Sequence, residues 1–447
     1  MERLLRVGTC LAECGYGAQV GQLAATARAL RGDVQLWAAH ARHRGPRGRT
    51  LLMHAAWTGS VDRIGFLLER GADVEAVTST FGETALMFAC QAGHCEAARV
   101  LVARGGANVN AARTTDGGTA LMLASQNGHL EIVRCLVERG GADVNAARTT
   151  DGMTALMWAS QKGHLEIVCY LVERGGAKAN AAMTNGFTVL MWACQEGHLE
   201  IVRFLVERGG ANVNAARTTN GMTALLWACQ KGHLEIVRCL VVRGGANVNA
   251  ARNSDGMTAL MWASEHGHLE IVRCLVERGG ANVNAAISDV GMTALMMASQ
   301  NGHLEIVRCL VERGGASVNA ARTDDGRTAL MWACSKGHLE IVRFLVDCGG
   351  AHVNAARTDD GATALMYACL DGHLETVRFF VEHGGASVNA AATSDGYTAL
   401  MLACEYGHLQ VVRLLLQHGA DRHALAHDGR SAHALAASHP LVQAALA

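Results

Sequence analysis

Aromatic residues and net charge are both scarce in this chain. Phe, Trp and Tyr make up only 4% of the 447 residues although half of all residues are apolar, so a core has to be filled mainly by Ala, Leu, Val, Ile and Met. That composition suits thin helices that pack closely. The 39 basic and 40 acidic residues leave a formal net charge of -1. This balance gives no general attraction to nucleic acid or anionic lipid, so neither is favoured as a partner.

Long apolar runs and paired cysteine motifs are also missing. No apolar stretch approaches the roughly 20 residues of a membrane-spanning helix, and the N-terminal MERLLRVGTCLAECGYG lacks the clear features of a signal peptide. We therefore predict no membrane span and a location in the cytosol or nucleus. The 15 cysteines mostly recur at equivalent positions of a repeated segment. Repeats stacked about 10 Å apart exceed the roughly 7 Å Cα limit of a disulfide, which predicts reduced thiols in small apolar slots.

The repeated segment, about 35 residues long, runs down almost the whole chain. One copy reads TALMWASQKGHLEIVCYLVERGG from Thr154 to Gly176. A fixed period with two helix-sized apolar runs per copy is typical of a solenoid, in which each unit buries its apolar face only against its neighbours. The Gly-His step of the copies falls at His94, His129, His164, His198, His233, His268, His303, His338, His373 and His408.

Local chemistry predicts two helices in each copy. Thr154 offers a hydroxyl to cap a first helix that runs to about Lys162, and Gly163 ends that helix because glycine adopts the left-handed conformation without steric cost. A second helix follows His164 and carries an apolar stripe, Ile167, Val168, Leu171 and Val172, that neighbouring helices must cover. Its other face pairs Glu and Arg at three- and four-residue spacing, which predicts a solvated surface rather than a charged binding site.

The pattern DGxTALMxAxxxGHLEIVRxLVERGGAxVNAA resembles the ankyrin repeat, a β-turn followed by two antiparallel helices. The resemblance covers Thr50 to about Arg430 and implies an all-α solenoid of stacked helix pairs with finger loops, used across that family to bind other proteins. We expect about eleven repeats over 50–430 and a degenerate C-terminal capping repeat over 431–447. Residues 1–49 are expected to be an N-terminal helical cap with a basic linker, or else a separate small element.

Two departures from the family pattern alter these expectations. TALM replaces TPLH, so Met157 puts apolar packing where the family has a polar network around the helix start. The 35-residue step exceeds the family's 33 by a second Gly after the second helix and one finger residue. Longer fingers with glycine hinges should be more mobile and reach further.

Two patterns resemble chemistry. A Ser or Cys stands four residues before each Gly-His histidine, as in Cys90 with His94 and Ser160 with His164, which is the composition of a nucleophile with a base or of a zinc site. The free exchange of Ser and Cys indicates a slot selected for smallness, and no acidic residue recurs to orient the base, so we predict no catalysis, metal or cofactor. The Gly-Gly pairs lack the context of a phosphate loop, and Asn-Val-Asn is interpreted as turn chemistry.

Positions that vary between copies are the better guide to binding. By the resemblance, the residue after the finger glycine lines the concave surface together with the two residues before Gly-His. Five consecutive large apolar residues would then form an exposed stripe about 40 Å long, with polar neighbours as its rim. The alternative is that these side chains fold inward as packing between repeats. The stripe consists of Met153, Phe187, Met222, Met257 and Met292, and the rim of Gln161, Lys162, Gln195, Glu196, Gln230, Lys231, Glu265 and His266.

The tryptophans on the first helices are expected to pack in the interior while their edges show in the groove; they are Trp158, Trp192, Trp227, Trp262 and Trp332. The leading hypothesis is a non-enzymatic, monomeric scaffold that binds a partner protein or peptide along the concave face and fingers. The alternative is an adaptor whose specificity lies in its ends, with the basic segment HARHRGPRGR, His40 to Arg49, contacting an acidic partner or nucleic acid.

Overall fold

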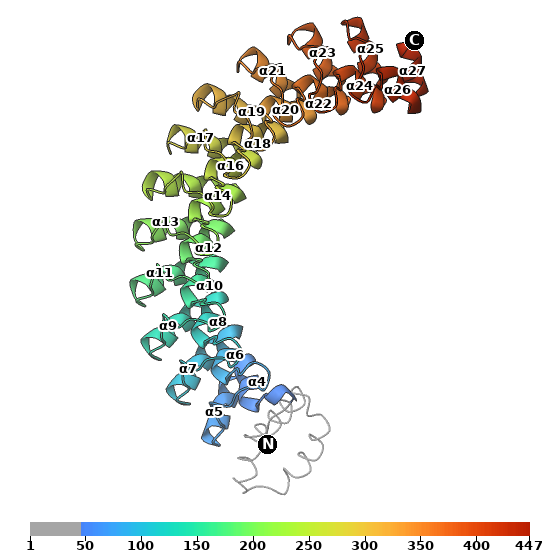
Figure 1. Ribbon diagram of the computed structural model, residues 1–447. Coiled ribbons are helices and arrows are strands. Elements are labelled where there is room, and N and C mark those ends of the chain that lie inside the picture. Colours follow the sequence, from blue (N-terminus) through green and yellow to red (C-terminus); the bar gives the residue numbers. More distant parts are fainter. Residues whose placement is uncertain (1–45) are drawn as a thin grey trace. The chain divides into compact units, whose positions relative to one another are not determined.

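The computed structural model describes residues 46–447 of the chain. The expected N-terminal cap and most of the basic segment His40 to Arg49 lie outside the described residues. By compactness the chain divides into two units, 1–219 and 220–447. Each unit is a stack of helix pairs (Figure 1) in which the first helices of successive repeats form one row and the second helices form another.

In the first unit the first helices are α4 (Leu51–Trp57), α6 (Ala85–Ala92), α8 (Ala120–Gln126), α10 (Ala155–Lys162) and α12 (Val189–Glu196), preceded by η1 (Pro46–Gly48). The second helices are α5 (Val61–Glu69), α7 (Cys95–Ala103), α9 (Leu130–Glu138), α11 (Leu165–Glu173) and α13 (Leu199–Glu207).

In the second unit the first helices are α14 (Ala224–Lys231), α16 (Ala259–Glu265), α18 (Ala294–Asn301), α20 (Ala329–Ser335), α22 (Ala364–Leu370) and α24 (Ala399–Glu405). The second helices are α15 (Leu234–Arg238) with η2 (Cys239–Arg243), α17 (Leu269–Glu277), α19 (Leu304–Arg308) with η3 (Cys309–Arg313), α21 (Leu339–Asp347), α23 (Leu374–Glu382) and α25 (Leu409–Gln417). A last pair follows, made of α26 (Ala432–Leu435), η4 (Ala436–Ser438) and α27 (Pro440–Leu446), with Pro440 in the first turn of α27.

The predicted helix boundaries are confirmed in the central copy. The Thr154 hydroxyl accepts a hydrogen bond from the Met157 amide at the start of α10, and Gly163 ends that helix at φ 80°. Met157 is fully buried, as expected for a TALM rather than a TPLH helix start. Helix α11 buries Ile167 and Val168 against its neighbours, so the two rows hold each other in place. Among residues 46–447, no helix is long and apolar enough to cross a membrane.

A ladder of histidines joins successive repeats. The Nε2 atom of His164 lies 3.1 Å from the Gln126 carbonyl oxygen of the preceding repeat, and that of His198 lies 3.0 Å from the Gln161 carbonyl. The ring of His198 also fills the space beside Gly163, because a Cβ added to that glycine would lie 2.7 Å from the ring. The Gly-His step therefore needs its glycine for room as well as for conformation.

A second ladder consists of the asparagine that ends each Asn-Val-Asn segment and of its equivalents in other repeats, such as Asn145 of Asp-Val-Asn. The Asn145 side chain donates to the Gly176 carbonyl and accepts from the Lys178 amide, both in the next repeat, at 3.1 and 2.9 Å. Asn284 and Asn319 make the same pair of contacts in the second unit. The interpretation of these residues as turn chemistry alone was incomplete, because they also join neighbouring repeats.

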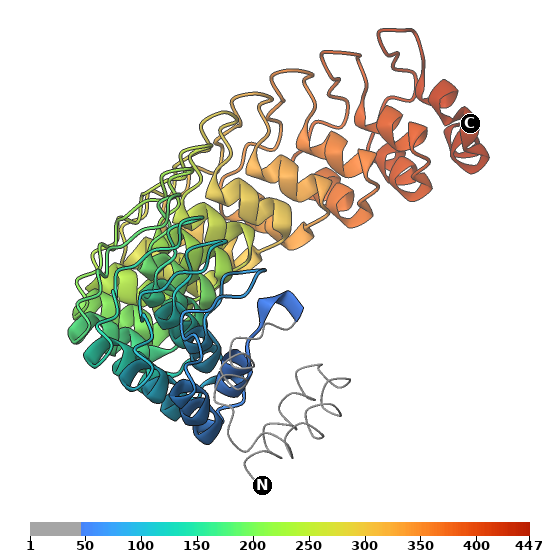
Figure 2. The same cartoon turned by 90° about the horizontal axis from the view of Figure 1, so that it is seen from below.

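The finger loops are short hairpins attached to one another. In one finger the Arg148 amide donates to the Met153 carbonyl at 2.9 Å, and the Thr149 amide donates to the Asp116 carbonyl of the preceding finger at 2.9 Å. Figure 2 shows the fingers of the second unit projecting side by side from one edge of its helix layer. The backbone bonds between neighbouring fingers make each row of fingers a continuous surface.

Candidate functional site

The finger loops and the exposed side chains of the first helices form one surface in each unit, which we call the finger face. The five residues of the expected apolar stripe do not reach it. Met153 is 3% exposed and Phe187 is 5% exposed, and the equivalent methionines of the second unit, Met222, Met257 and Met292, are also buried. The prediction of an exposed apolar stripe is therefore wrong.

The reason for this burial is the geometry of the finger. The carbonyl of Met153 closes the finger hairpin, and the next residue caps α10, so the Met153 side chain is trapped between the finger and the helix. Phe187 shows the result: its ring centroid lies 4.6 Å from that of Trp192 on the first helix and 5.9 Å from the Arg217 guanidinium of the next finger. The alternative, inward packing, describes these residues.

The tryptophans of the first helices are more exposed than the residues of the expected stripe. Trp158, Trp192, Trp227, Trp262 and Trp332 are all half-buried, in agreement with the expectation of interior packing with an edge at the surface. A finger arginine lies over several of these rings. Arg148 is 5.8 Å from the ring centroid of Trp158 in the first unit, and Arg252 is 5.2 Å from that of Trp262 in the second.

Acidic residues contact these arginines and their equivalents in other fingers, and Arg148 forms an ion pair with Asp151 of its own finger at 3.4 Å. Arg113 makes two hydrogen bonds to Asp116 at 3.0 and 2.5 Å, and Arg252 makes an equivalent pair with Asp255. Burial alone would raise the pKa of Asp116, but hydrogen bonds from the Gly118 amide and from Arg113 outweigh it and lower that pKa. The hydrogen bond from Arg252 is the main reason why the pKa of Asp255 is lowered. Arg113 and Arg252 are thereby held in place by acids of their own fingers.

The second unit carries a denser version of this arrangement. Arg327, which replaces methionine after the finger glycine, lies between the rings of Trp332 and Tyr367 at 4.8 and 5.0 Å. Its Nε donates to the Tyr367 hydroxyl at 3.0 Å, and Arg357 donates to the same hydroxyl at 2.8 Å. Sequence reasoning missed the finger arginines, although the Ala-Ala-Arg that precedes most finger turns was available to point to them.

The rim residues reach the surface at the C-terminal ends of the first helices. In the first unit Lys162 and Glu196 are exposed while Gln161 and Gln195 are half-buried. In the second unit the rim shows the same alternation. There Lys231 and His266 are exposed while Gln230 and Glu265 are half-buried. The charge at the exposed position thus changes from repeat to repeat, whereas the surrounding residues that determine the fold stay constant.

The Ser/Cys and His constellation has a structural explanation. Ser160 donates to the Val189 carbonyl of the next repeat at 3.0 Å, while His164 contacts the carbonyl of the preceding repeat, so the two side chains serve different neighbours. Burial raises the pKa of the Cys90 thiol, which disfavours the nucleophilic thiolate. In the part of the chain that the structure describes, no group of three or more His, Cys, Asp or Glu side chains is placed to hold a metal ion.

Comparison with known families agrees with this architecture. A model for three copies of the ankyrin repeat matches residues 52–148, 107–183, 142–217, 209–287, 280–357 and 351–425. The chain belongs to the ankyrin repeat family. No curated protein matches the sequence. Ankyrin repeats are a non-enzymatic fold and generally serve as protein–protein interaction modules.

Proposed function

We propose that this ankyrin repeat protein is a scaffold that holds a partner protein or peptide on its finger face. The observation that carries the proposal is the pairing of a half-buried tryptophan with an anchored finger arginine, as in Trp158 with Arg148 and Trp262 with Arg252. Trp and Arg are enriched among the residues that dominate binding energies, because a large flat side chain already held in place loses little entropy on binding.

The rim supplies specificity in this proposal. Lys162 and Glu196 stand at equivalent positions of neighbouring repeats with opposite charges, so a partner crossing them has to present the complementary order of charges. Exposed charges at the edge of an interface mainly set the rate and selectivity of association. The tryptophan and arginine pairs provide the affinity, and the rim distinguishes one partner from another.

A charge swap tests the proposal without disturbing the core. Exchanging the two rim charges, Lys162→Glu with Glu196→Lys, leaves the net charge unchanged, and both side chains are exposed. We expect a loss of about tenfold in partner affinity, which corresponds to about 1.4 kcal/mol, with unchanged helicity by circular dichroism. The matched control exchanges Glu200 and Arg203 of α13, an exposed ion pair at 3.0 Å on the row of second helices.

Two outcomes decide the matter. Partner binding that survives the rim swap but is lost in the α13 swap would place the interface on the second helices and overturn the proposal. Truncating an anchor gives the complementary result: Trp158→Ala is expected to weaken binding by about 2 kcal/mol or more, as for other buried aromatic anchors of interfaces. Equal binding by wild type and this variant would show that the tryptophans serve only the fold.

A further inference from the structure

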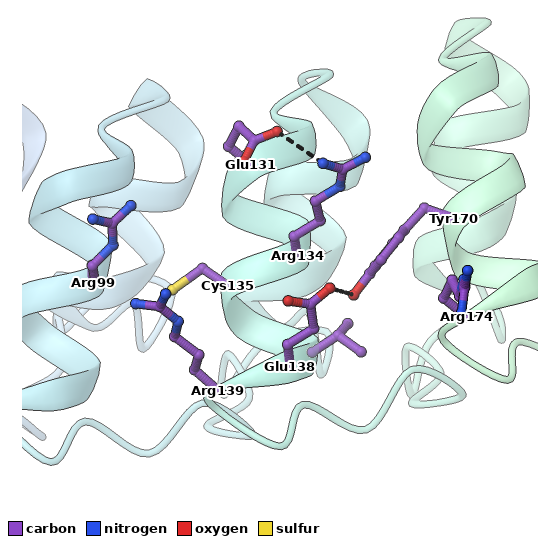
Figure 3. Close-up of a pocket in the computed structure, with 9 residues that line it drawn as sticks. Arg99, Glu131, Arg134, Cys135, Glu138, Arg139, Tyr170 and Arg174 are labelled. Atoms are coloured by element: carbon purple, nitrogen blue, oxygen red, sulfur yellow. Dashed lines mark hydrogen bonds and ion pairs between the residues drawn. The ribbon is translucent and has the colours of Figure 1, made fainter.

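An open pocket lies on the opposite side of the repeats, on the second helices of the first unit. It has a volume of about 730 Å³ and is formed by α7, α9 and α11. Four arginines line it, Arg99, Arg134, Arg139 and Arg174, which Figure 3 shows on three successive helix pairs. Two glutamates, Glu131 and Glu138, and the ring of Tyr170 complete its polar wall.

The two glutamates are already engaged. Glu131 forms an ion pair with Arg134 at 3.4 Å, and Glu138 accepts a hydrogen bond from the Tyr170 hydroxyl at 3.1 Å (Figure 3). Arg99 is paired outside the pocket wall with Glu96 at 2.9 Å. Arg139 and Arg174 are exposed and make no ion pair with any residue of the described chain.

In two other repeats the arginine at the same register pairs with a glutamate of the preceding repeat, as Arg208 does with Glu173 at 2.7 Å and Arg313 does with Glu277. Where the acid is missing, as at Val242 before Arg278, no such pair can form. For Arg139 the corresponding position is Ala103, which has no carboxylate. The interruption is therefore a property of the sequence and not of one side-chain conformation.

For Arg174 the acid at the corresponding position is Glu138, whose carboxylate accepts a hydrogen bond from Tyr170 and does not pair with Arg174. Neighbouring repeats have Cys135 and Phe204 at the position of Tyr170, and neither can donate a hydrogen bond of this kind from the same place. Burial and the hydrogen bond to Glu138 raise the pKa of Tyr170 to about 12, so its hydroxyl stays protonated at neutral pH and remains a donor. Two substitutions in adjacent repeats thus leave two guanidinium groups uncompensated on one pocket.

We propose that this pocket binds an acidic linear segment of a partner protein. A guanidinium group presents a planar fork of donors that matches the two oxygens of a carboxylate, and Arg139 and Arg174 offer two such forks. Adjacent repeats place them about 10 Å apart. Carboxylates three residues apart in a polyproline II segment lie on the same face and are separated by about the same distance, at three residues per turn and about 3.1 Å per residue. The ring of Tyr170 and the Val137 side chain give the segment an apolar wall between the two charges.

This interaction surface is distinct from the finger face, so either proposal can fail without the other. The test uses the full chain and a fluorescent, end-capped peptide of polyproline II conformation with glutamates three residues apart, with anisotropy as the readout. Arg139→Gln combined with Arg174→Gln should weaken binding about tenfold. The control, Arg203→Gln combined with Arg208→Gln, removes the same charge from two arginines that already have acidic partners and should change the affinity less than twofold.

Further variants test whether peptide binding depends on Arg139 and Arg174 lacking acidic partners, and not only on the number of positive charges. Tyr170→Phe keeps the net charge but releases Glu138 to pair with Arg174, so it should weaken peptide binding severalfold. Ala103→Glu supplies the acid that Arg139 lacks and should do the same, while Ala103→Gln should not. Circular dichroism and thermal melting confirm that each variant is folded.

The proposal is overturned by any of three results. One is an equal loss in the test and control pairs, which would mean attraction to charge in general. Another is unchanged binding in Tyr170→Phe together with Ala103→Glu. The third is tighter binding of a single-stranded oligonucleotide of matched charge that is lost in the same variants, which would assign the pocket to nucleic acid.

Discussion

The contact between each helix-ending glycine and the next repeat's histidine leads to a quantitative prediction. Gly163→Ala places a Cβ 2.7 Å from the His198 ring, at a backbone φ of 80°. The left-handed conformation costs an L-residue about 1–2 kcal/mol. Moving the ring away also breaks its hydrogen bond to the Gln161 carbonyl, a further loss of about 0.5–1.5 kcal/mol. The expected destabilisation is about 1.5–3.5 kcal/mol.

The control separates the two contributions. Gly176→Ala has a similar φ of 70° but no atom within 4 Å of the added Cβ, so it should lose only the conformational part. Because an array of repeats need not unfold in one step, hydrogen exchange of the amides in α10 and α12 is the suitable assay. Faster exchange in Gly163→Ala than in Gly176→Ala is expected. Equal exchange in the two variants would refute the claim that the ring contact holds adjacent repeats together.

Three further predictions concern the core and the ladders. Asn145→Ala removes two hydrogen bonds to the next repeat and should destabilise the neighbouring helices by about 1–3 kcal/mol, measured by hydrogen exchange. Burial lowers the pKa of His268 below its usual 6.5, so the unfolded chain binds the proton more tightly than the folded chain does. The free energy of unfolding, measured at a series of pH values, should therefore fall as the pH drops below about 6.5. The fall should be smaller in His268→Gln. At pH 8 a thiol reagent should label the exposed Cys348 at once. Burial raises the pKa of Cys369, so that thiol should react only after the protein unfolds. Equal labelling rates for the two cysteines would contradict this.

Sequence reasoning succeeded where the deciding chemistry is local. The ends of α10 follow from the hydroxyl of Thr154 and the conformational freedom of Gly163, both within the helix that they bound. The burial of Met157 followed in the same way, because an apolar residue three places after a cap faces the interior. The interaction module followed from the repeat pattern as a whole.

It failed where the deciding contact comes from another repeat. Met153 looks like a surface residue because it stands in a finger loop, and only the position of that finger over the first helix shows that its side chain is enclosed. The partner of His198 lies 37 residues earlier in the chain, and the Lys178 amide that Asn145 accepts from lies 33 residues later. No local pattern specifies such pairs, so the sequence argued against catalysis by the histidines without showing which carbonyls they contact, and the asparagine was interpreted as a turn residue alone.

The most direct test of the scaffold proposal is site-specific photo-crosslinking of the bound partner. A photoreactive amino acid is placed at Lys162 in the first unit and at Lys231 in the second, both exposed on the finger face, and at Glu200 and Glu235 on the second helices as controls. The account predicts that the partner crosslinks from the two finger-face positions and not from the controls. Crosslinking from Glu200 or Glu235 alone would contradict it.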